Sequence, residues 1–238
     1  GGDSLTAPHP AARVGPNKRS RELAMMPAGR ARLAAIFASC VLAGALDKWD
    51  SSGTAGADWV FSNGDRTANI SSGVTGSPRS VYGEDVFTGS GVHRLTIQLD
   101  TFTSNIAVFG VAVETDNGEF VFTLNDNVPS AADGFDGFGY SNGGKPYRGA
   151  TELDTGYQGD AFNTSTSTLT CILDLDAGAL YFEVDGILQA GGAAAFTSLD
   201  TSQNYVFAYS GNAPGEQITI PDPSPSPPPS PPPPGSPP

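Results

Sequence analysis

One hairpin-like stretch centred on residue 178 constrains the fold more than any other part of this sequence. Apolar residues alternate with mostly polar ones on both sides of the short turn Ala177-Gly178. Period-two alternation around a Gly-containing turn is typical of an antiparallel β-hairpin with one buried face. The alternating apolar residues are Leu169, Cys171, Leu173 and Leu175 before the turn, and Leu180, Phe182 and Val184 after it. Because a lone hairpin is marginally stable in water, other strands must cover this face.

Short strand-like segments recur along residues 58–220, and turn signals separate them. Asn63-Gly64 and Asn117-Gly118 are strong hairpin dipeptides. The segments predicted as strands, besides the hairpin, are two within 58–71, then 93–99, 106–115, 119–124, 205–209 and 217–220. Residues 75–85, 129–137 and 141–149 are predicted as loops. With no convincing helix, this spacing predicts an all-β fold, an antiparallel β-sandwich.

Several of these segments follow one another in a recognisable order. They are FTGSGVHRLTIQL at 87–99, FGVAV at 109–113, GFGY at 137–140, Gly159-Asp160, ILDLDAG at 172–178, LYFEVDG at 180–186 and AAAFTSL at 193–199. Together they resemble the SPRY domain family over residues 46–221. Leu95 and Thr96 stand where the family usually has Trp and Glu. The resemblance implies a sandwich of the concanavalin-like jelly-roll type.

The same resemblance implies a binding role, without catalysis or a cofactor. SPRY domains generally bind short peptide segments of protein partners through loops at one edge of the sandwich. Carried over to this sequence, the implied binding residues are Pro78, Arg79, Ser80, Tyr82, Phe120, Ser210, Gly211 and Asn212. The family's aromatic anchor in the last of these loops has no counterpart here.

Residues 25–45 have the three-part layout of a secretory signal peptide. A short basic stretch precedes 13 apolar residues, and Ala43-Gly44-Ala45 fits a cleavage site. The apolar run is too short to span a bilayer. We therefore expect residues 1–24 to be an upstream or disordered segment and the mature protein to be secreted.

The last residues, 222–238, are almost entirely Pro and Ser. Such a segment cannot donate ladder hydrogen bonds and should extend as polyproline II, reaching about 50 Å at about 3.1 Å per residue. The pattern resembles the stalks of hydroxyproline-rich cell-wall glycoproteins of plants and green algae. The expected location is therefore an extracellular matrix or cell wall.

Two sequons fit a secreted protein, with Asn69 and Asn163 as acceptors, and Asn163 lies in the more loop-like sequence. Cleavage after Ala45 would remove Cys40 and leave Cys171 as the sole thiol. Its position among alternating leucines predicts a buried, inert side chain. His93, the only histidine after the signal peptide, stands where the family has a structural histidine.

The charge balance argues against nucleic-acid partners. The whole chain has a formal net charge of −13. Residues 46–238 hold 6 basic and 23 acidic residues, a net charge of −17, which repels phosphate backbones. Asp126, Asp133 and Asp136 do not match the spacing of a calcium loop, and no Cys/His cluster is present for zinc, so no metal site is predicted.

Two short segments match patterns found in catalytic sites. Gly139-Tyr140-Ser141-Asn142-Gly143 fits a nucleophile elbow, but no helix can follow promptly and no histidine lies downstream. Glu114 and Glu119 fit the E-x-D-x-x-E pattern of laminarinase-type glycoside hydrolases. The intervening Asn117-Gly118 favours a tight turn, which would break a catalytic strand.

The sequence therefore favours a non-catalytic recognition module that binds a peptide segment of a protein partner. Two alternatives remain open at this stage. One is a lectin for cell-wall glycans, suggested by the expected location and by Tyr140 and Tyr147. The other is the hydrolase based on Glu114 and Glu119.

Overall fold

The computed structural model describes residues 48–52, 58–72, 78–114, 120–121, 137–149 and 151–222. The expected upstream segment, signal peptide and Pro-rich stalk lie outside these residues, apart from Asp222 at the stalk's first position. Within them, no helix combines the length and the apolar character needed to cross a membrane. The one helical element in this part is a short 3-10 turn, η3, at Gln189–Gly192.

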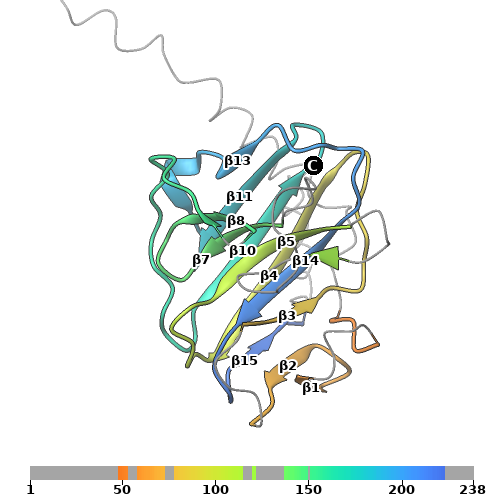
Figure 1. Cartoon of the computed structure of the whole chain (residues 1–238), viewed down its shortest axis with the longest axis vertical. Coiled ribbons are helices and arrows are strands. Elements are labelled where there is room, and N and C mark those ends of the chain that lie inside the picture. The colour runs from red at the N-terminus through yellow and green to blue at the C-terminus, as the bar shows by residue number, and fades with distance from the viewer. Residues whose placement is uncertain are drawn as a thin grey trace, which may run out of the picture.

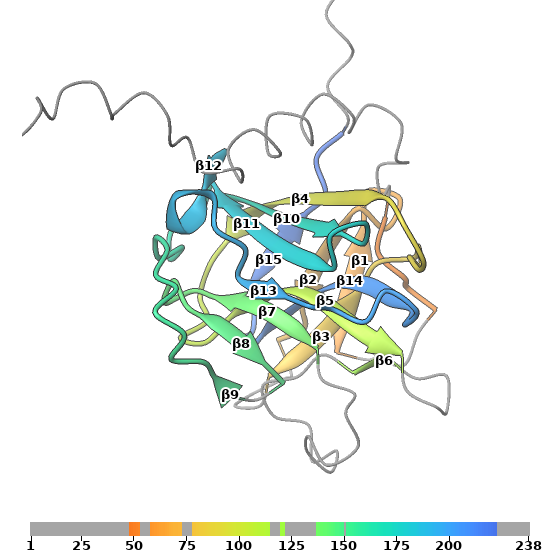
Figure 2. The same cartoon turned by 90° about the horizontal axis from the view of Figure 1, so that it is seen from above.

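Two antiparallel sheets pack face to face, as predicted (Figure 1). The first sheet has the order β1-β2-β15-β4-β10-β11-β12, with β13 also paired to β11. Its strands are β1 (Trp59–Ser62), β2 (Thr67–Ile70), β4 (Val92–Thr101), β10 (Thr168–Asp174), β11 (Ala179–Val184), β12 (Ile187–Leu188), β13 (Phe196–Thr197) and β15 (Gln217–Thr219). Figure 2 shows this layer lying over the second.

The second sheet has the order β3-β14-β5-β7-β8-β9, with β6 paired to β5. Its strands are β3 (Arg79–Tyr82), β5 (Val108–Glu114), β6 (Phe120–Val121), β7 (Phe138–Ser141), β8 (Pro146–Arg148), β9 (Thr151–Glu152) and β14 (Tyr205–Gly211). The all-β sandwich expected from the sequence is thus confirmed.

The predicted hairpin forms β10 and β11 of the first sheet, between β4 and β12. Cys171 pairs with Phe182, and Leu173 pairs with Leu180, in the expected register. All four side chains are buried between the sheets. The opposite parity is also largely buried, which the alternation did not predict. There, for example, Asp174 accepts a hydrogen bond from the turn residue Ala177 at 2.8 Å instead of facing water.

The core joins the two sheets through aromatic side chains. Tyr140 from β7 stacks on Phe182 from β11, with ring centroids 5.2 Å apart. Phe138, also from β7, meets Phe196 of β13 edge to face at 5.1 Å. These contacts fix where β7 lies relative to the first sheet. Alternating residues of β4, β5 and β14 fill the rest of this core: Leu95, Ile97, Leu99, Phe109, Val111, Val113, Tyr205, Phe207 and Tyr209.

Local turn chemistry accounts for β1 and β2. Asn63 and Gly64 both have positive φ angles, 55° and 63°, so the predicted tight hairpin turn is present. The prediction of a loop over residues 75–85 was wrong at its centre, because β3 occupies Arg79–Tyr82. This short segment becomes a strand because it pairs with β14, which lies 130 residues further along the chain.

The two ends of the described domain meet at Arg66. Its backbone oxygen accepts a hydrogen bond from the Trp49 indole at 3.1 Å. Its guanidinium donates to the backbone oxygen of Ile220 at 3.2 Å and forms an ion pair with Asp222 at 2.8 Å. One residue, through its backbone and its side chain, therefore holds the first and last described segments together.

Candidate functional site

Two of the three predicted binding segments come together at one end of the second sheet. Ser80 is opposite Ser210, and Arg79 is opposite Gly211, in the pairing of β3 with β14. We call this region, comprising Pro78, Arg79, Ser80, Tyr82, Ser210, Gly211 and Asn212, the β3–β14 edge. The structure thus places side by side two segments that the resemblance assigned to one binding edge.

Phe120 does not join them. Its backbone pairs with Glu114, at the far end of β5 from Val108, the residue opposite Ser210. Six residues of strand separate the two positions, or about 20 Å at about 3.3 Å per residue. The Phe120 side chain lies outside the described part of the structure. Its binding role therefore stays a prediction, separate from the β3–β14 edge.

Ser210 and Gly211 were expected in a loop after the strand, but β14 continues through Gly211. Ser210 is only 1% exposed. Asn212 is the first residue beyond the strand, and its backbone N–H donates to Ser104 Oγ at 2.8 Å. Its side-chain amide donates to Asn105 Oδ1 at 2.5 Å. Ser104 and Asn105 therefore also belong to this end, although no pattern in the sequence marked them.

The charge of Arg79 is already engaged within the protein. Its Nε forms an ion pair with Asp58, and its Nη1 donates to the backbone oxygen of Pro78 at 3.2 Å. Tyr82 is half-buried and packs on the outer face of the second sheet. The side chains beneath it form a separate apolar cluster of Val108, Ala112, Val206 and Ala208. The edge therefore presents one aromatic ring and several small polar groups.

Polar atoms without partners gather at this end of the molecule. Four buried atoms have no hydrogen-bond partner among the described residues: Ser210 Oγ, Asn212 Oδ1, Trp59 Nε1 and Glu216 Oε2. Most buried polar atoms in proteins are satisfied, and leaving one unpaired costs about 1–3 kcal/mol. A concentration of such atoms indicates unused hydrogen-bonding capacity beside the β3–β14 edge.

Glu216 is the most unusual residue in this group, because its side chain is completely buried. Burial raises the pKa of its carboxyl group to about 8, while hydrogen bonds from Tyr209 and from the backbone around Ser104 oppose the rise. The carboxyl group packs against Gly211. A Cβ atom at that glycine would lie 2.7 Å from Glu216 Oε2, so the glycine is required for the close approach.

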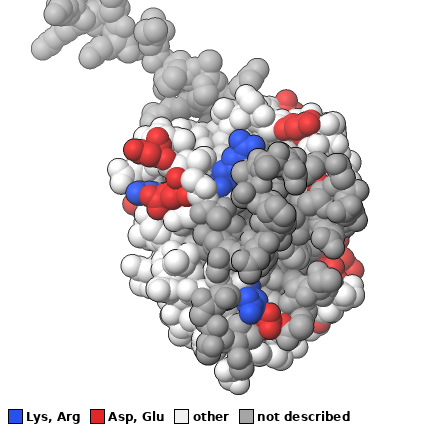
Figure 3. Space-filling view, viewed as in Figure 1, with Lys and Arg blue, Asp and Glu red and all other residues white. Residues whose placement is uncertain are grey.

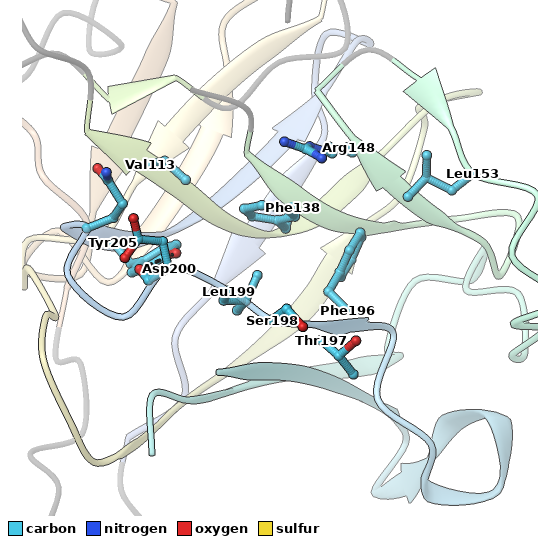
Figure 4. Close-up of a pocket in the computed structure, with 11 residues that line it drawn as sticks. Val113, Phe138, Arg148, Leu153, Phe196, Thr197, Ser198, Leu199, Asp200 and Tyr205 are labelled. Atoms are coloured by element: carbon cyan, nitrogen blue, oxygen red, sulfur yellow. Dashed lines mark hydrogen bonds between the residues drawn. The ribbon is translucent and has the colours of Figure 1, made fainter. Parts of the chain in front are cut away.

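A pocket of about 290 Å³ lies at the opposite end of the second sheet (Figure 4). Val113 and Tyr205, which face each other across β5 and β14, mark that end. The apolar lining consists of Val113, Phe138, Leu153, Phe196 and Leu199, and the polar lining of Arg148, Thr197, Ser198, Asp200, Gln203 and Tyr205. Sequence reasoning missed this pocket, because its walls come from segments up to 92 residues apart, from Val113 to Tyr205.

The candidate nucleophile Ser141 is the last residue of β7, directly before the turn that leads to β8. Its Oγ accepts a hydrogen bond from the Lys145 backbone at 3.3 Å, and the chain continues into β8 rather than a helix. The side chain is 5% exposed. The strand-turn-helix geometry of a nucleophile elbow is therefore absent at this position.

Glu114 ends β5, and the chain returns antiparallel as β6. The Asn204 side-chain amide donates to Glu114 Oε2, and its backbone oxygen accepts from the Glu114 N–H at 3.0 Å. Glu119 and residues 115–118 lie outside the described residues, as do Asp126, Asp133 and Asp136. In the part that is described, no group of three or more His, Cys, Asp or Glu residues is placed to hold a metal ion.

Cys171 and His93 occupy structural environments. Cys171 is fully buried, and burial raises the pKa of its thiol well above the usual value, so it remains a thiol. His93 packs on Phe87 with ring centroids 4.3 Å apart, and its Nε2 lies 3.3 Å from the backbone oxygen of Ser90. Both positions agree with the packing roles expected from the sequence.

The remaining predicted residues differ in accessibility. Asn163 is exposed in the turn before β10, whereas Asn69 is half-buried in β2, between β1 and β15. Tyr140, considered for stacking on a sugar, is 1% exposed, and its hydroxyl donates to the Asp160 backbone oxygen at 2.5 Å. Tyr140 therefore belongs to the core, and Tyr147 is half-buried on the outer face of the second sheet.

The architecture belongs to a known structural class, because it has the fold of SPRY domains. The SPRY domain of human HERC1 superposes with a TM-score of 0.50 at 18% identity, covering 68% of this chain and 91% of that domain. The TRIM65 PSpry domain gives a TM-score of 0.50 at 14% identity, covering 73% of this chain and 90% of that domain. No family model and no curated protein matches the sequence.

Proposed function

We propose that this chain is a non-catalytic recognition module that binds a peptide segment of a protein partner through the β3–β14 edge. The fold supports this proposal, because it is similar to the SPRY domain of human HERC1 and to the TRIM65 PSpry domain. The resemblance of the sequence to SPRY domains implies peptide binding through loops at one edge of the sandwich. Peptide binding by such an edge needs a preformed surface with a few polar groups. The described residues of the edge supply one.

The observation that carries the proposal is the juxtaposition of Ser80 with Ser210 and of Arg79 with Gly211. Beside this pair, Ser210 and Asn212 each hold a polar atom without a partner in the described structure. An extended peptide could use Asn212 at the end of the strand and pack against the ring of Tyr82. The Arg79–Asp58 ion pair would orient the neighbouring backbone without providing a free charge.

We further propose that the module is secreted and held in an extracellular matrix or cell wall by its Pro-rich segment. The signal-peptide layout of residues 25–45 and the composition of residues 222–238 support this location. The exposed sequon at Asn163 supports it as well. N-terminal sequencing of the protein released from secreting cells would test the cleavage site after Ala45.

The binding site is tested by selection of a displayed random 12-residue peptide library on the full chain. A Tyr82→Ala or Asn212→Ala variant should bind the selected peptides at least tenfold more weakly, as expected for central contact residues. Ile187→Ala is the matched control, because Ile187 is exposed on β12 in the other sheet. The proposal would be overturned if both edge variants bound the selected peptides as tightly as the parent chain does, or if no peptide could be selected.

A further inference from the structure

The pocket at the far end of the second sheet is a candidate for a second binding site. Its apolar floor consists of Phe138 and Phe196, which meet edge to face from opposite sheets. Leu153 and Leu199 extend the floor on two sides (Figure 4). A volume of about 290 Å³ is at the lower limit of ligand pockets, which run from about 300 to 1,000 Å³. The space therefore suits one bulky side chain better than an extended ligand.

One wall of the pocket is held in a fixed shape. Ser198 has a φ angle of 63°, a left-handed conformation that is uncommon for a residue other than glycine. The next residue, Leu199, is anchored by its N–H to the backbone oxygen of Gly178 at 2.9 Å. Strained backbone of this kind persists only where the surroundings enforce it, and it is frequent at binding sites. The pocket is therefore preformed on this side.

Asp200 places a fixed negative charge at the rim. Its Oδ1 accepts hydrogen bonds from the Ser202 N–H at 3.0 Å and from the Ser202 hydroxyl at 2.7 Å. The Tyr205 hydroxyl donates to the Asp200 backbone oxygen at 2.9 Å. The Ser202 hydrogen bonds hold the pKa of the Asp200 carboxyl group below its usual value. The carboxylate is thus both oriented and ionised.

The charges around the pocket favour a cationic partner. Its one basic residue, Arg148, lies over the ring of Phe138, with the guanidinium carbon 5.6 Å from the ring centroid. Glu114 and Asp154 directly follow the lining residues Val113 and Leu153 in the chain. The chain as a whole has a net charge of −13, and the face shown in Figure 3 carries acidic groups alongside a few basic ones. Such a field attracts positively charged partners.

We propose that this pocket takes an aromatic or bulky aliphatic side chain of a peptide whose neighbouring residues are Lys or Arg. The apolar side chain packs on Phe138 and Phe196, and the adjacent cation pairs with Asp200 at the rim. This site is separate from the β3–β14 edge, since Val113 and Val108 mark opposite ends of β5. The proposal therefore goes beyond the function given above and can fail or hold independently of it.

The test uses an array of synthetic peptides on the full chain. Each peptide carries Phe, Trp or Leu at a central position, flanked by Arg, Ser or Glu in otherwise identical sequences. We expect Arg-flanked peptides with an apolar centre to bind at least tenfold more tightly than Glu-flanked ones, and this preference to weaken as salt rises. Equal binding of Arg- and Glu-flanked peptides would overturn the proposal.

Variants assign the binding to the pocket. Asp200→Asn retains an acceptor for Ser202 but removes the negative charge. This variant should bind the Arg-flanked peptides about tenfold more weakly than the parent chain does. Thr197→Arg, at an exposed lining position, should abolish binding by occupying the space. Asp65→Asn and Thr101→Arg are the matched controls, both in the first sheet's part of the fold and remote from the pocket lining.

The two proposals give distinguishable results. Peptides in the pocket should bind a Tyr82→Ala variant as tightly as they bind the parent chain. Peptides that lose affinity through Tyr82→Ala but not through Asp200→Asn or Thr197→Arg would show that only the β3–β14 edge binds, which would overturn the pocket proposal. Circular dichroism melts of each variant establish that it is folded before binding is compared.

Discussion

The hydroxyl group of Tyr209 donates a hydrogen bond to Oε1 of Glu216, and both side chains are 0% exposed. Tyr209 is in β14 of the second sheet, whereas Glu216 immediately precedes β15 of the first. The bond therefore spans the point at which the chain crosses between the sheets. Because Glu216 Oε2 has no hydrogen-bond partner within the described part of the chain, the pair is sensitive to the protonation state of the carboxyl group.

We expect stability to fall as the pH rises from about 5 to 8. Burial raises the pKa of Glu216 from 4.5 to about 8, so in this window the folded protein holds a proton that the unfolded chain has lost. The stabilisation is complete below the unfolded value of 4.5 and disappears as the pH passes the folded value. The slope should reach at most about 1.4 kcal/mol per pH unit for one such group.

Urea unfolding at pH 5, 6, 7 and 8 measures this slope, and Glu216→Gln should reduce it. Some slope of the same sign should remain in the variant, because burial also raises the pKa of Glu183, which Arg94 partly opposes. If the parent protein were equally stable at pH 5 and pH 8, the raised pKa of the Glu216 carboxyl group would be contradicted.

Gly110→Ala should destabilise the second sheet strongly. A Cβ atom at Gly110 would lie 2.0 Å from the backbone oxygen of Phe138 on the neighbouring strand β7. Backbone cannot yield as a flexible side chain does, so we expect a loss of about 3 kcal/mol. Gly143→Ala is the control, since its nearest contact would be 3.7 Å from Ser141 Oγ. Chemical denaturation of both variants measures the difference in stability. Similar unfolding midpoints for the two variants would refute the prediction.

Phe182→Ala should cost about 3–5 kcal/mol, the usual range for removing a buried aromatic side chain. Phe182 is 1% exposed and stacks on Tyr140, so its removal opens a cavity between the sheets. Val60→Ala, at a position 57% exposed on β1, should change stability by less than about 0.5 kcal/mol. Thermal melts followed by circular dichroism test the pair. A small effect at Phe182 would mean that the hairpin face is not the core.

In a eukaryotic secretory host, Asn163 should carry an N-linked glycan and Asn69 should not. Asn163 is exposed in a turn, whereas Asn69 is in a strand paired on both sides and followed by the buried Ile70. Asn163→Gln should therefore remove the glycosidase-sensitive shift on a gel, and Asn69→Gln should leave it. The prediction fails if mass spectrometry finds a glycan on Asn69 alone.

The sequence predicted those parts of the fold that local chemistry determines. The alternation around Ala177-Gly178 predicted which face of the hairpin packs between the sheets, although it missed the burial of the opposite face, and Asn63-Gly64 predicted the position of the first turn. Residues 79–82 were missed because their extended conformation depends on pairing with β14, and four residues are too few for a clear period.

The two candidate sites also differ in how far the sequence predicted them. The family resemblance predicted the residues of the β3–β14 edge, but the extension of β14 to Gly211 depends on the pairing of Gly211 with Arg79 in β3. The pocket left no local signal, since Phe138 and Phe196 are ordinary apolar residues until the two sheets bring them together. Burial of Glu216 likewise follows from the crossover between sheets and not from its neighbours in sequence.

The contacts of Arg66 have a mechanical consequence. Because its backbone meets Trp49 and its side chain meets Ile220 and Asp222, tension applied between the two ends of the domain loads this residue before it reaches the strands. These few part-buried polar contacts would yield first, and the sandwich would keep its shape while the ends are drawn apart. Tension between the ends would thus leave both proposed binding surfaces undistorted.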